Sequence, residues 1–305
     1  MSCAKQVLVA LAFCLALIAG CNEPGVETQT DDDTQQGLLS IGLVPELNIF
    51  NQIERYEPIA DYLSKKIGFK IKLRVFARHK DVIRAFADEG LDAAFLGSFA
   101  YVLAHSNFGV EAIAREENML GKSTSHGLIF VRKDRPIKDA NDMKGKIFVM
   151  VDRATTAGYL FPLAYFKKYG IGDPKLFFKE AYFSGTYQSA VYDVLDKKAD
   201  AGATKDTVIK RLAEVDNRVK NELVFLAKSS EMPDNCLAVR NTLDKAVKAR
   251  LKKNLLNLHL DPGADKILRD FGAKRFVETS DFDYADLYRY LQELEIDLST
   301  YNHLN

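Results

Sequence analysis

From residue 39 onward the sequence alternates short apolar runs with amphipathic stretches, and no other feature constrains the fold as strongly. In the first part of the chain the predicted strands cover residues 39–44, 70–76 and 93–96, and the predicted helices cover 53–67, 81–87 and 99–105. Strands that alternate with helices in this way indicate βαβ units, which form a mostly parallel sheet with helices on both faces.

The same alternation then starts again, which predicts a second unit of the same kind. Its strands are predicted at 147–151, 175–179, 199–203 and 223–227, and its helices at 162–168, 188–197 and 207–213. A strand at 128–131 leaves the first sheet and leads into a polar crossing, and a second crossing at 229–235 precedes a strand at 237–239. The end of the chain is predicted to be helical, at 243–258, 262–271 and 284–294.

These elements predict an α/β protein of two lobes, each a mostly parallel sheet flanked by helices. Lobe 1 is expected to span residues 38–133 and lobe 2 residues 134–230, and residues 231–305 are expected to return to lobe 1 with the C-terminal helices. This is the layout of a hinged binding protein. Ligands of open α/β sheets bind beyond the carboxyl ends of strands, so the cleft between the lobes is the expected site.

Residues 1–20 have the pattern of a signal peptide. Lys5 precedes an unbroken apolar run at 7–19, which is shorter than the roughly 20 residues of a transmembrane helix. The run ends in Ile-Ala-Gly-Cys, which resembles the bacterial lipobox, so Cys21 is the expected site of lipid attachment; the alternative is an ordinary cleaved signal with a chance cysteine. Residues 21–37 are polar and are expected to form a flexible tether. The protein is then expected at the periplasmic or extracytoplasmic face of a bacterial membrane.

The charge composition excludes some partners. The 42 Lys and Arg residues equal the 42 Asp and Glu residues, so the chain has no net charge that would attract nucleic acid, and an anionic ligand must be held by local donors. Outside the signal peptide and Cys21, the single cysteine is Cys236. One thiol forms no internal disulfide, and its strand-like surroundings favour a buried, inert side chain.

The segment 151–162 follows a predicted strand and leads into a predicted helix. Thr155 and Thr156 carry hydroxyl groups, and the small residues Ala157 and Gly158 leave consecutive main-chain N–H groups open to an anion. Such N–H groups are unpaired at a helix start, where the positive end of the helix dipole adds to them. This segment is the strongest candidate for gripping an oxyanion.

Two local alternatives remain for that segment. Thr155 could simply cap the helix. Pro162 lies too far from Thr155 to occupy the first turn of one continuous helix. Either the helix kinks there, or a separate turn precedes a helix that begins near Pro162.

A second strand, tight turn and helix start lie at 95–101 in lobe 1. Ser98 is the expected N-cap, and Tyr101 lies one turn further on, from where its phenol could reach the cleft. The alternative is that Gly97 turns, Ser98 caps and Tyr101 packs. Tyr56, on the first helix, carries another phenol, although a tyrosine in that place more often packs on a sheet.

Six short segments form a series along the chain. They are Arg-Tyr-Glu-Pro at 55–58 with Asp-Tyr-Leu at 61–63, Asp-Ala-Ala-Phe-Leu-Gly at 92–97 with Ala-Tyr at 100–101, Met-Lys-Gly-Lys at 143–146, Thr-Thr-Ala-Gly-Tyr-Leu at 155–160 with Pro162, Gly-Thr-Tyr at 185–187, and Ala-Asp-Ala-Gly-Ala at 199–203. In order and spacing they resemble the phosphate/phosphite/phosphonate-binding proteins of bacterial ABC importers, over nearly the whole chain after the signal peptide.

The resemblance implies a type II periplasmic-binding-protein fold in its lipoprotein form. It implies that a tetrahedral oxyanion is gripped by residues 155–158 and by Tyr101, with Tyr56 as a further candidate. The partners would be the oxyanion, an ABC permease with its ATPase, and the membrane through the lipid anchor. Neither a cofactor, a metal nor a nucleic acid is expected.

The chain departs from the family pattern at four places. Members commonly have Ser-Thr-Ser-Gly where this chain has Thr-Thr-Ala-Gly at 155–158, so the third hydroxyl of the motif is lost at Ala157. They also commonly have a histidine where this chain has Tyr187, an acidic residue where it has Gln188, and a tyrosine near Ser125. Tyr187 is a neutral donor and Gln188 does not neutralise an ammonium group. A different oxyanion, or an organic ligand of similar shape, stays open.

Enzyme motifs are missing from the sequence: it has no Gly-x-Ser-x-Gly, His-Glu-x-x-His, Walker-type or Gly-x-Gly-x-x-Gly segment in the required setting, and its five histidines lack metal-ligand spacing. The protein is therefore expected not to be an enzyme, and a ligand-sensing lipoprotein of the same fold is the main alternative to a transport component. The candidate ligand-binding residues are Thr155, Thr156, Ala157, Gly158, Tyr101, Ser98, Tyr187, Gln188, Tyr56 and Asp206, the last of which is also expected to cap a helix.

Overall fold

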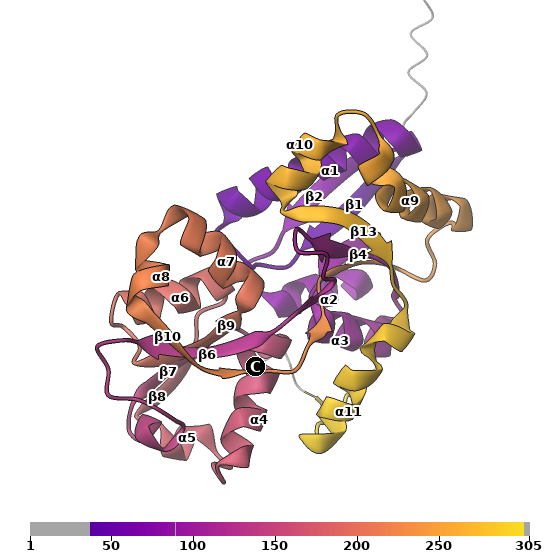
Figure 1. Ribbon diagram of the computed structural model, residues 1–305. Helices are drawn as coiled ribbons and strands as arrows, with labels where there is room; N and C mark the ends of the chain where they lie inside the picture. The colour runs from indigo at the N-terminus through magenta and orange to yellow at the C-terminus, as the bar shows by residue number, and fades with distance from the viewer. Residues whose placement is uncertain (1–36, 89, 302–305) are drawn as a thin grey trace, which may run out of the picture. The chain divides into compact units, whose positions relative to one another are not determined.

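Two twisted sheets, one in each lobe, organise the chain in this computed structural model (Figure 1). The structure describes residues 37–88 and 90–301. The predicted signal peptide, the lipid-attachment residue Cys21 and the tether up to residue 36 lie outside the described residues. Within the described part of the chain, no helix is long and apolar enough to cross a membrane.

The sheet of lobe 1 has six strands in the order β13-β4-β12-β3-β1-β2. β1 pairs in parallel with β2 and β3, whereas β12 and β13 pair antiparallel with their neighbours, so the sheet is mixed rather than mostly parallel. The bounds are β1 (Leu38–Leu43), β2 (Lys70–Val75), β3 (Ala93–Leu96), β4 (Glu111–Asn118), β12 (Cys236–Val239) and β13 (Ala273–Glu278). β4 and β13 were not predicted from the sequence.

Helices cover both faces of this sheet because successive strand residues point to opposite sides. Ala93 and Phe95 of β3 join a buried cluster with one set of helices, and Ala94 and Leu96 join another cluster with the second set. The first set is α1 (Ile49–Ile67), α9 (Lys245–Asn257) and α10 (Ala264–Phe271), and the second is α2 (His79–Asp88) and α3 (Ser98–Phe108).

The sheet of lobe 2 has five strands in the order β10-β6-β9-β7-β8, again with parallel pairs at β7 and antiparallel pairs at β6. The strands are β6 (Gly127–Arg132), β7 (Ile147–Met150), β8 (Glu180–Phe183), β9 (Ala201–Lys205) and β10 (Leu223–Lys228). The helices are α4 (Phe161–Lys168), α5 (Pro174–Phe177), α6 (Tyr187–Leu195), α7 (Asp206–Val215) and α8 (Asn217–Glu222). The strand predicted at 175–179 is therefore wrong: a short helix occupies most of that segment, and the strand follows it.

The chain crosses between the lobes at two short strands that pair antiparallel, β5 (Thr124–Ser125) and β11 (Met232–Pro233). β6 belongs to the sheet of lobe 2, so the first crossing precedes residue 127, and the expected boundary between residues 133 and 134 was placed too late. The second crossing lies within the predicted segment 229–235.

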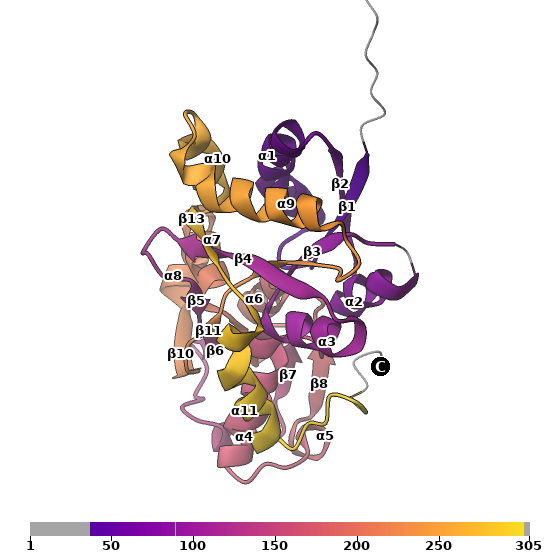
Figure 2. The same ribbon diagram turned by 90° about the vertical axis from the view of Figure 1, so that its right-hand side faces the viewer.

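The C-terminal helix α11 (Ala285–Glu293) lies beside α3 of lobe 1 and α4 of lobe 2 (Figure 2). Leu287 and Leu291 of this helix share one buried cluster with residues of both helices. Further on, the Tyr301 ring packs on Phe99 at 5.3 Å between centroids, and its hydroxyl donates to the Arg153 carbonyl at 2.8 Å. The expected return to lobe 1 is thus only part of the arrangement, because the end of the chain also contacts lobe 2.

Candidate functional site

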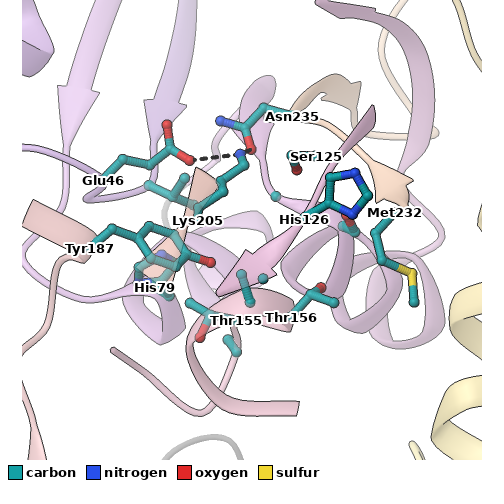
Figure 3. Close-up of a pocket in the computed structure, with 16 residues that line it drawn as sticks. Glu46, His79, Ser125, His126, Thr155, Thr156, Tyr187, Lys205, Met232 and Asn235 are labelled. Carbon is teal, nitrogen blue, oxygen red and sulfur yellow. Dashed lines mark hydrogen bonds and ion pairs between the residues drawn. The ribbon is translucent and has the colours of Figure 1, made fainter. Parts of the chain in front are cut away.

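A small cavity lies where strand ends from both lobes meet the crossing strands (Figure 3). Thr155 and Thr156 lie on one side of it and Lys205 and Asn235 on the opposite side, with Tyr187 and His126 at its flanks. Its volume is about 30 Å³, and on this measure a single water molecule needs about 10–15 Å³. The closed site therefore suits one compact solute of a few atoms.

The segment after β7 forms a π-helical turn at Thr156–Leu160, and α4 follows it directly. Pro162 occupies the first turn of α4, where its missing N–H costs nothing. The second of the two local alternatives is therefore correct: a separate turn precedes the helix. Single π-helical turns are rare and occur often at functional sites.

Thr156 and Ala157 of this turn line the cavity, and the N–H groups of these two residues have no partner in the part of the chain that the structure describes. The Thr155 N–H and hydroxyl both donate to the Asp152 carbonyl, at 3.1 and 2.6 Å, so this threonine closes its own turn. The first intra-turn bonds run from Leu160 N–H to the Thr155 carbonyl and from Phe161 N–H to the Thr156 carbonyl. Among residues 37–88 and 90–301, the N–H groups of Thr156 and Ala157 have no acceptor.

Gly158 has a packing role in the same turn. A Cβ atom at this position would lie 2.4 Å from Cβ of Val151 and 2.9 Å from the hydroxyl oxygen of Thr155. The backbone of the turn could not approach β7 so closely with any other residue. Gly158 does not line the cavity, unlike the three residues before it.

A buried ion cluster forms the opposite wall. The Lys205 ammonium lies 3.1 Å from a Glu46 oxygen, 2.5 Å from an Asp234 oxygen and 2.9 Å from the side-chain oxygen of Asn235. Arg55 continues the cluster, because its guanidinium donates to Glu46 at 3.3 Å and to Glu116 at 2.6 Å. Within this cluster each cation pairs with two carboxylates.

The pKa values in the cluster follow from burial and pairing. Burial opposes ionisation of Glu46, but Lys205 and Arg55 outweigh burial and lower the pKa of this carboxyl from 4.5 to about 2. Burial likewise opposes the charge on Lys205, and the carboxylates of Asp234 and Glu46 outweigh it, so the pKa of the ammonium rises well above its ordinary value. Lys205 and Glu46 are therefore both ionised at neutral pH.

The remaining polar groups of the cavity include neutral donors. Burial raises the pKa of Tyr187, which keeps the phenol protonated. His79 is almost fully buried, its Nδ1 has no hydrogen-bond partner among the described residues, and burial lowers its pKa, so the ring is neutral. The Nδ1 of His126 donates to the Ser229 carbonyl at 2.9 Å, since a carbonyl only accepts. The side-chain nitrogen of Asn235 is also buried without a partner within the described chain.

The structure brings five of the ten predicted residues to this cavity: Ser98, Thr155, Thr156, Ala157 and Tyr187. Ser98 is not an N-cap as expected. Gly97 has the N-cap backbone conformation, and the Ser98 hydroxyl donates to the Pro233 carbonyl of the crossing strand.

The two other tyrosines lie in the core of lobe 1, away from the cavity. The Tyr101 hydroxyl donates to Asp281 at 3.1 Å and its ring packs on Tyr284, which is the packing alternative left open above. Tyr56 is 1% exposed and its ring packs between Phe95 and Phe271.

Gln188 and Asp206 also lie outside the cavity lining. The Gln188 side-chain oxygen accepts from the Asn48 N–H at 3.0 Å, so this residue joins lobe 2 to lobe 1. Asp206 accepts from the His126 N–H at 3.0 Å and pairs with Lys210 at 3.3 Å. The N-cap of α7 is Lys205, and Asp206 is the first residue of the helix.

Sequence reasoning missed a larger part of the site. Glu46 follows β1 and Lys205 ends β9, so both stand at strand ends, where ligands of such sheets bind. That position was the available signal. No motif marked their pairing, because the two residues are 159 positions apart. The other missed lining residues with polar or sulfur-bearing side chains are His79, Ser125, His126, Met232 and Asn235.

Cys236 is buried within β12, as expected for an inert thiol. Burial raises its thiol pKa to about 12, so the reactive thiolate form is scarce at neutral pH.

The fold and the cavity between its lobes define a type II periplasmic binding protein. The chain belongs to the family described as "ABC transporter, phosphonate, periplasmic substrate-binding protein", whose model matches residues 41–284. This is a family of transport binding proteins.

Individual relatives agree with this assignment. The chain is 24% identical over 261 residues to a phosphate-import protein of Mycolicibacterium smegmatis, covering 82% of this chain and 81% of the relative. It is 22% identical over 260 residues to the phosphonates-binding periplasmic protein of Escherichia coli, covering 84% and 76%.

Solved structures share the fold. A binding protein component of an ABC phosphonate transporter from Pseudomonas aeruginosa matches with a TM-score of 0.81 at 22% identity, covering 85% of this chain and 87% of the other. A Prochlorococcus marinus protein in complex with methylphosphonate matches with a TM-score of 0.76 at 20% identity, covering 85% and 98%.

Proposed function

We propose that this chain captures a small phosphorus oxyanion, such as phosphite, phosphate or methylphosphonate, and delivers it to a membrane permease driven by an ATPase. The observation that carries the proposal is the pair of N–H groups at Thr156 and Ala157, which have no acceptor among the described residues and belong to residues that line the small cavity between the lobes. Relatives named for phosphate import, phosphonate binding and phosphite binding support the same class of ligand.

The donors suit a tetrahedral oxyanion. The Thr156 hydroxyl oxygen accepts from the Phe99 N–H at 3.1 Å, which leaves the hydroxyl proton for a ligand oxygen. With the N–H groups of Thr156 and Ala157 and the phenol of Tyr187, the cavity offers donors from several directions. A hydrogen bond to a charged group contributes about 1.5–3 kcal/mol, so a few of them hold a small anion tightly.

The ligand does not require a direct contact with Lys205 or Arg55. Lys205 and Arg55 already pair with carboxylates, so the ligand is held by neutral donors and by the positive end of the turn and helix after β7. Binding by fixed neutral donors selects ligands by the spatial arrangement of their oxygen atoms.

Closure of the two lobes assembles the site. Beside the bond from Phe99 to Thr156, the Gln188 N–H donates to the Glu46 carbonyl at 3.2 Å, and the Asn48 N–H donates to the Gln188 side chain at 3.0 Å. A ligand that contacts both lobes only when they are closed shifts the equilibrium toward this conformation by its difference in affinity.

A lipid at Cys21 completes the proposal. The apolar run and the Ile-Ala-Gly-Cys sequence at 18–21 support an acylated cysteine that holds the protein at the outer face of a membrane, within reach of a permease.

A thermal-shift series tests the ligand class, because a solute that binds only the folded form raises the melting temperature. The series uses phosphite, phosphate, methylphosphonate, sulfate and acetate with the purified protein, followed by calorimetry of the best solute. We expect at least one phosphorus oxyanion to raise the melting temperature while acetate does not. A response to acetate alone, or to none of the phosphorus compounds, would refute the proposal.

A further inference from the structure

We propose that Lys205 determines ligand specificity by keeping ammonium-bearing ligands out of the cavity. Its ammonium group pairs with the carboxylates of Glu46 and Asp234, which would otherwise be available to the amine of a ligand. The inference rests on the proposed function, in that it specifies which members of the phosphorus oxyanion class the same cavity accepts.

Three acceptor oxygens surround the ammonium group of Lys205. Glu46, Asp234 and Asn235 each supply one oxygen, at 3.1, 2.5 and 2.9 Å. The side chains of Lys205, Glu46 and Asp234 are 7%, 5% and 2% exposed, so water does not share in these contacts. Three acceptors arranged around one ammonium group are also what a ligand amine requires.

Two of the three acceptor residues, Glu46 and Asn235, stand at the wall of the cavity, and Asp234 lies behind it. Glu46, Lys205 and Asn235 all line it, opposite Thr155 and Thr156 (Figure 3). A ligand held through its oxygens at the turn after β7 therefore has this cluster on its far side. With Lys205 present, an amine on that side meets a fixed positive charge.

The charge balance of the cluster shows what the lysine neutralises. Arg55 pairs with Glu46 and Glu116, and Lys205 pairs with Glu46 and Asp234. Among the described residues, removing Lys205 leaves Asp234 without an ion-pair partner and Glu46 with Arg55 alone. The void left by the lysine side chain would open onto the cavity and face two carboxylates.

The chemical class follows from this arrangement. The natural site accepts oxyanions whose fourth substituent is small and uncharged, and it rejects zwitterionic aminoalkylphosphonates because their ammonium would lie beside that of Lys205. Truncation of the lysine inverts this preference.

Calorimetry with methylphosphonate and 2-aminoethylphosphonate tests the proposal on the natural protein and on K205A. We expect the natural protein to bind methylphosphonate at least tenfold more tightly than 2-aminoethylphosphonate, and K205A to move this ratio at least tenfold toward the amine. K205M is the matched control, since methionine fills the same space without a charge, and it should not gain the amine. The double variant K205A/E46Q should lose most of the gain.

A second measurement covers the case in which K205A folds poorly, because it leaves buried carboxylates unpaired. Propylammonium, which matches the deleted atoms, should raise the melting temperature of K205A and leave that of the natural protein unchanged, whereas 1-propanol should do neither. This readout needs no phosphonate, so it separates failure of this inference from failure of the proposed function. Equal affinities of the natural protein for both phosphonates, or equal responses of K205A to propylammonium and propanol, would overturn the inference.

Discussion

The main-chain N–H of Phe99, at the start of α3 in lobe 1, donates to the hydroxyl oxygen of Thr156 in lobe 2 at 3.1 Å. A hydroxyl both accepts and donates, so the same side chain joins the lobes through its oxygen and keeps its proton for a ligand. Closure of the lobes and binding of the ligand therefore both depend on the Thr156 hydroxyl group. A substitution of Thr156 should impair both.

Replacement of Thr156 by alanine should weaken the binding of the best phosphorus oxyanion by about 1–3 kcal/mol, because one donor to a charged ligand and one contact between the lobes are lost. Titration calorimetry measures the change. Thr300→Ala, at an exposed position near the C-terminus, is the control and should bind as the natural protein does. An unchanged affinity in Thr156→Ala would remove this residue from the site.

Replacement of Tyr187 by phenylalanine should weaken binding by about 1.5–3 kcal/mol, since it removes one donor to the charged ligand from the cavity wall. Tyr101→Phe is the matched control: its hydroxyl bonds to Asp281 away from the cavity, so affinity should not change. If Tyr101→Phe weakens binding more than Tyr187→Phe, then Tyr101 of lobe 1 contacts the ligand, and the assignment of Tyr187 as the phenol donor is wrong.

The Glu46 carboxyl should make stability depend on pH in the acidic range. Its pKa in the folded protein is about 2, below the ordinary 4.5, so its contribution is fully present above pH 4.5 and is lost as the pH falls toward 2. The difference between these pKa values corresponds to about 3 kcal/mol. Urea unfolding of the natural protein and of Glu46→Gln should therefore differ most at neutral pH, and the difference should shrink below pH 4.5 and disappear as the pH reaches about 2.

An exposed carboxyl supplies the comparison for that experiment. Glu57 lies exposed on α1 and forms no ion pair within the described part of the chain, so Glu57→Gln should leave the stability of the protein at neutral pH unchanged. If the gap between Glu46→Gln and the natural protein keeps its size down to pH 3, the Glu46 carboxylate does not stabilise the fold through Lys205 and Arg55.

Replacement of Gly158 by alanine should destabilise the protein by about 1–3 kcal/mol and weaken ligand binding, because the new methyl group would overlap Val151 and push the turn away from β7. Gly172→Ala is the control, since a Cβ atom there meets nothing within 4 Å. Chemical unfolding and calorimetry measure the two effects. If Gly158→Ala and Gly172→Ala have equal free energies of unfolding, the turn accommodates the added methyl group without destabilising the fold.

Replacement of Cys21 by alanine should release the protein from the membrane fraction of expressing cells, because the acyl chains would be absent. Cys236→Ala should leave the protein in the membrane fraction, since that thiol is buried in β12. Fractionation followed by immunoblotting separates the outcomes. A Cys21→Ala protein that remains with membranes would show that another part of the chain holds it there.

The two-lobed α/β fold was predictable because its strands are short apolar runs separated by amphipathic helices. β4 escaped prediction for a physical reason: Arg115, Glu116 and Glu117 interrupt its apolar pattern. Glu116 is nevertheless buried, because Arg55 from α1 pairs with it. In the sequence, a strand with buried charged residues has the pattern of a surface segment, because the residues that pair with those charges are not apparent.

The turn after β7 was predictable because it combines a strand end, two threonines and small residues in one stretch of chain. The ion cluster of Glu46, Lys205 and Asp234 was not, since its members come from three distant segments. Tyr101 was predicted to reach the site but does not. A phenol one turn into a helix can point in several directions, and contacts with Asp281 and Tyr284 hold this one in the core of lobe 1.

The bond from Tyr301 to the Arg153 carbonyl has a practical consequence for handling the protein. Tyr301 contacts Arg153, three residues before the turn at Thr156–Leu160, so a purification tag fused close behind Tyr301 would lie near the ligand-gripping turn. Affinities obtained from such a fusion would include the disturbance of the tag. Placing the tag ahead of residue 37 avoids this, since β1 begins at the end of lobe 1 that is remote from lobe 2 (Figure 1).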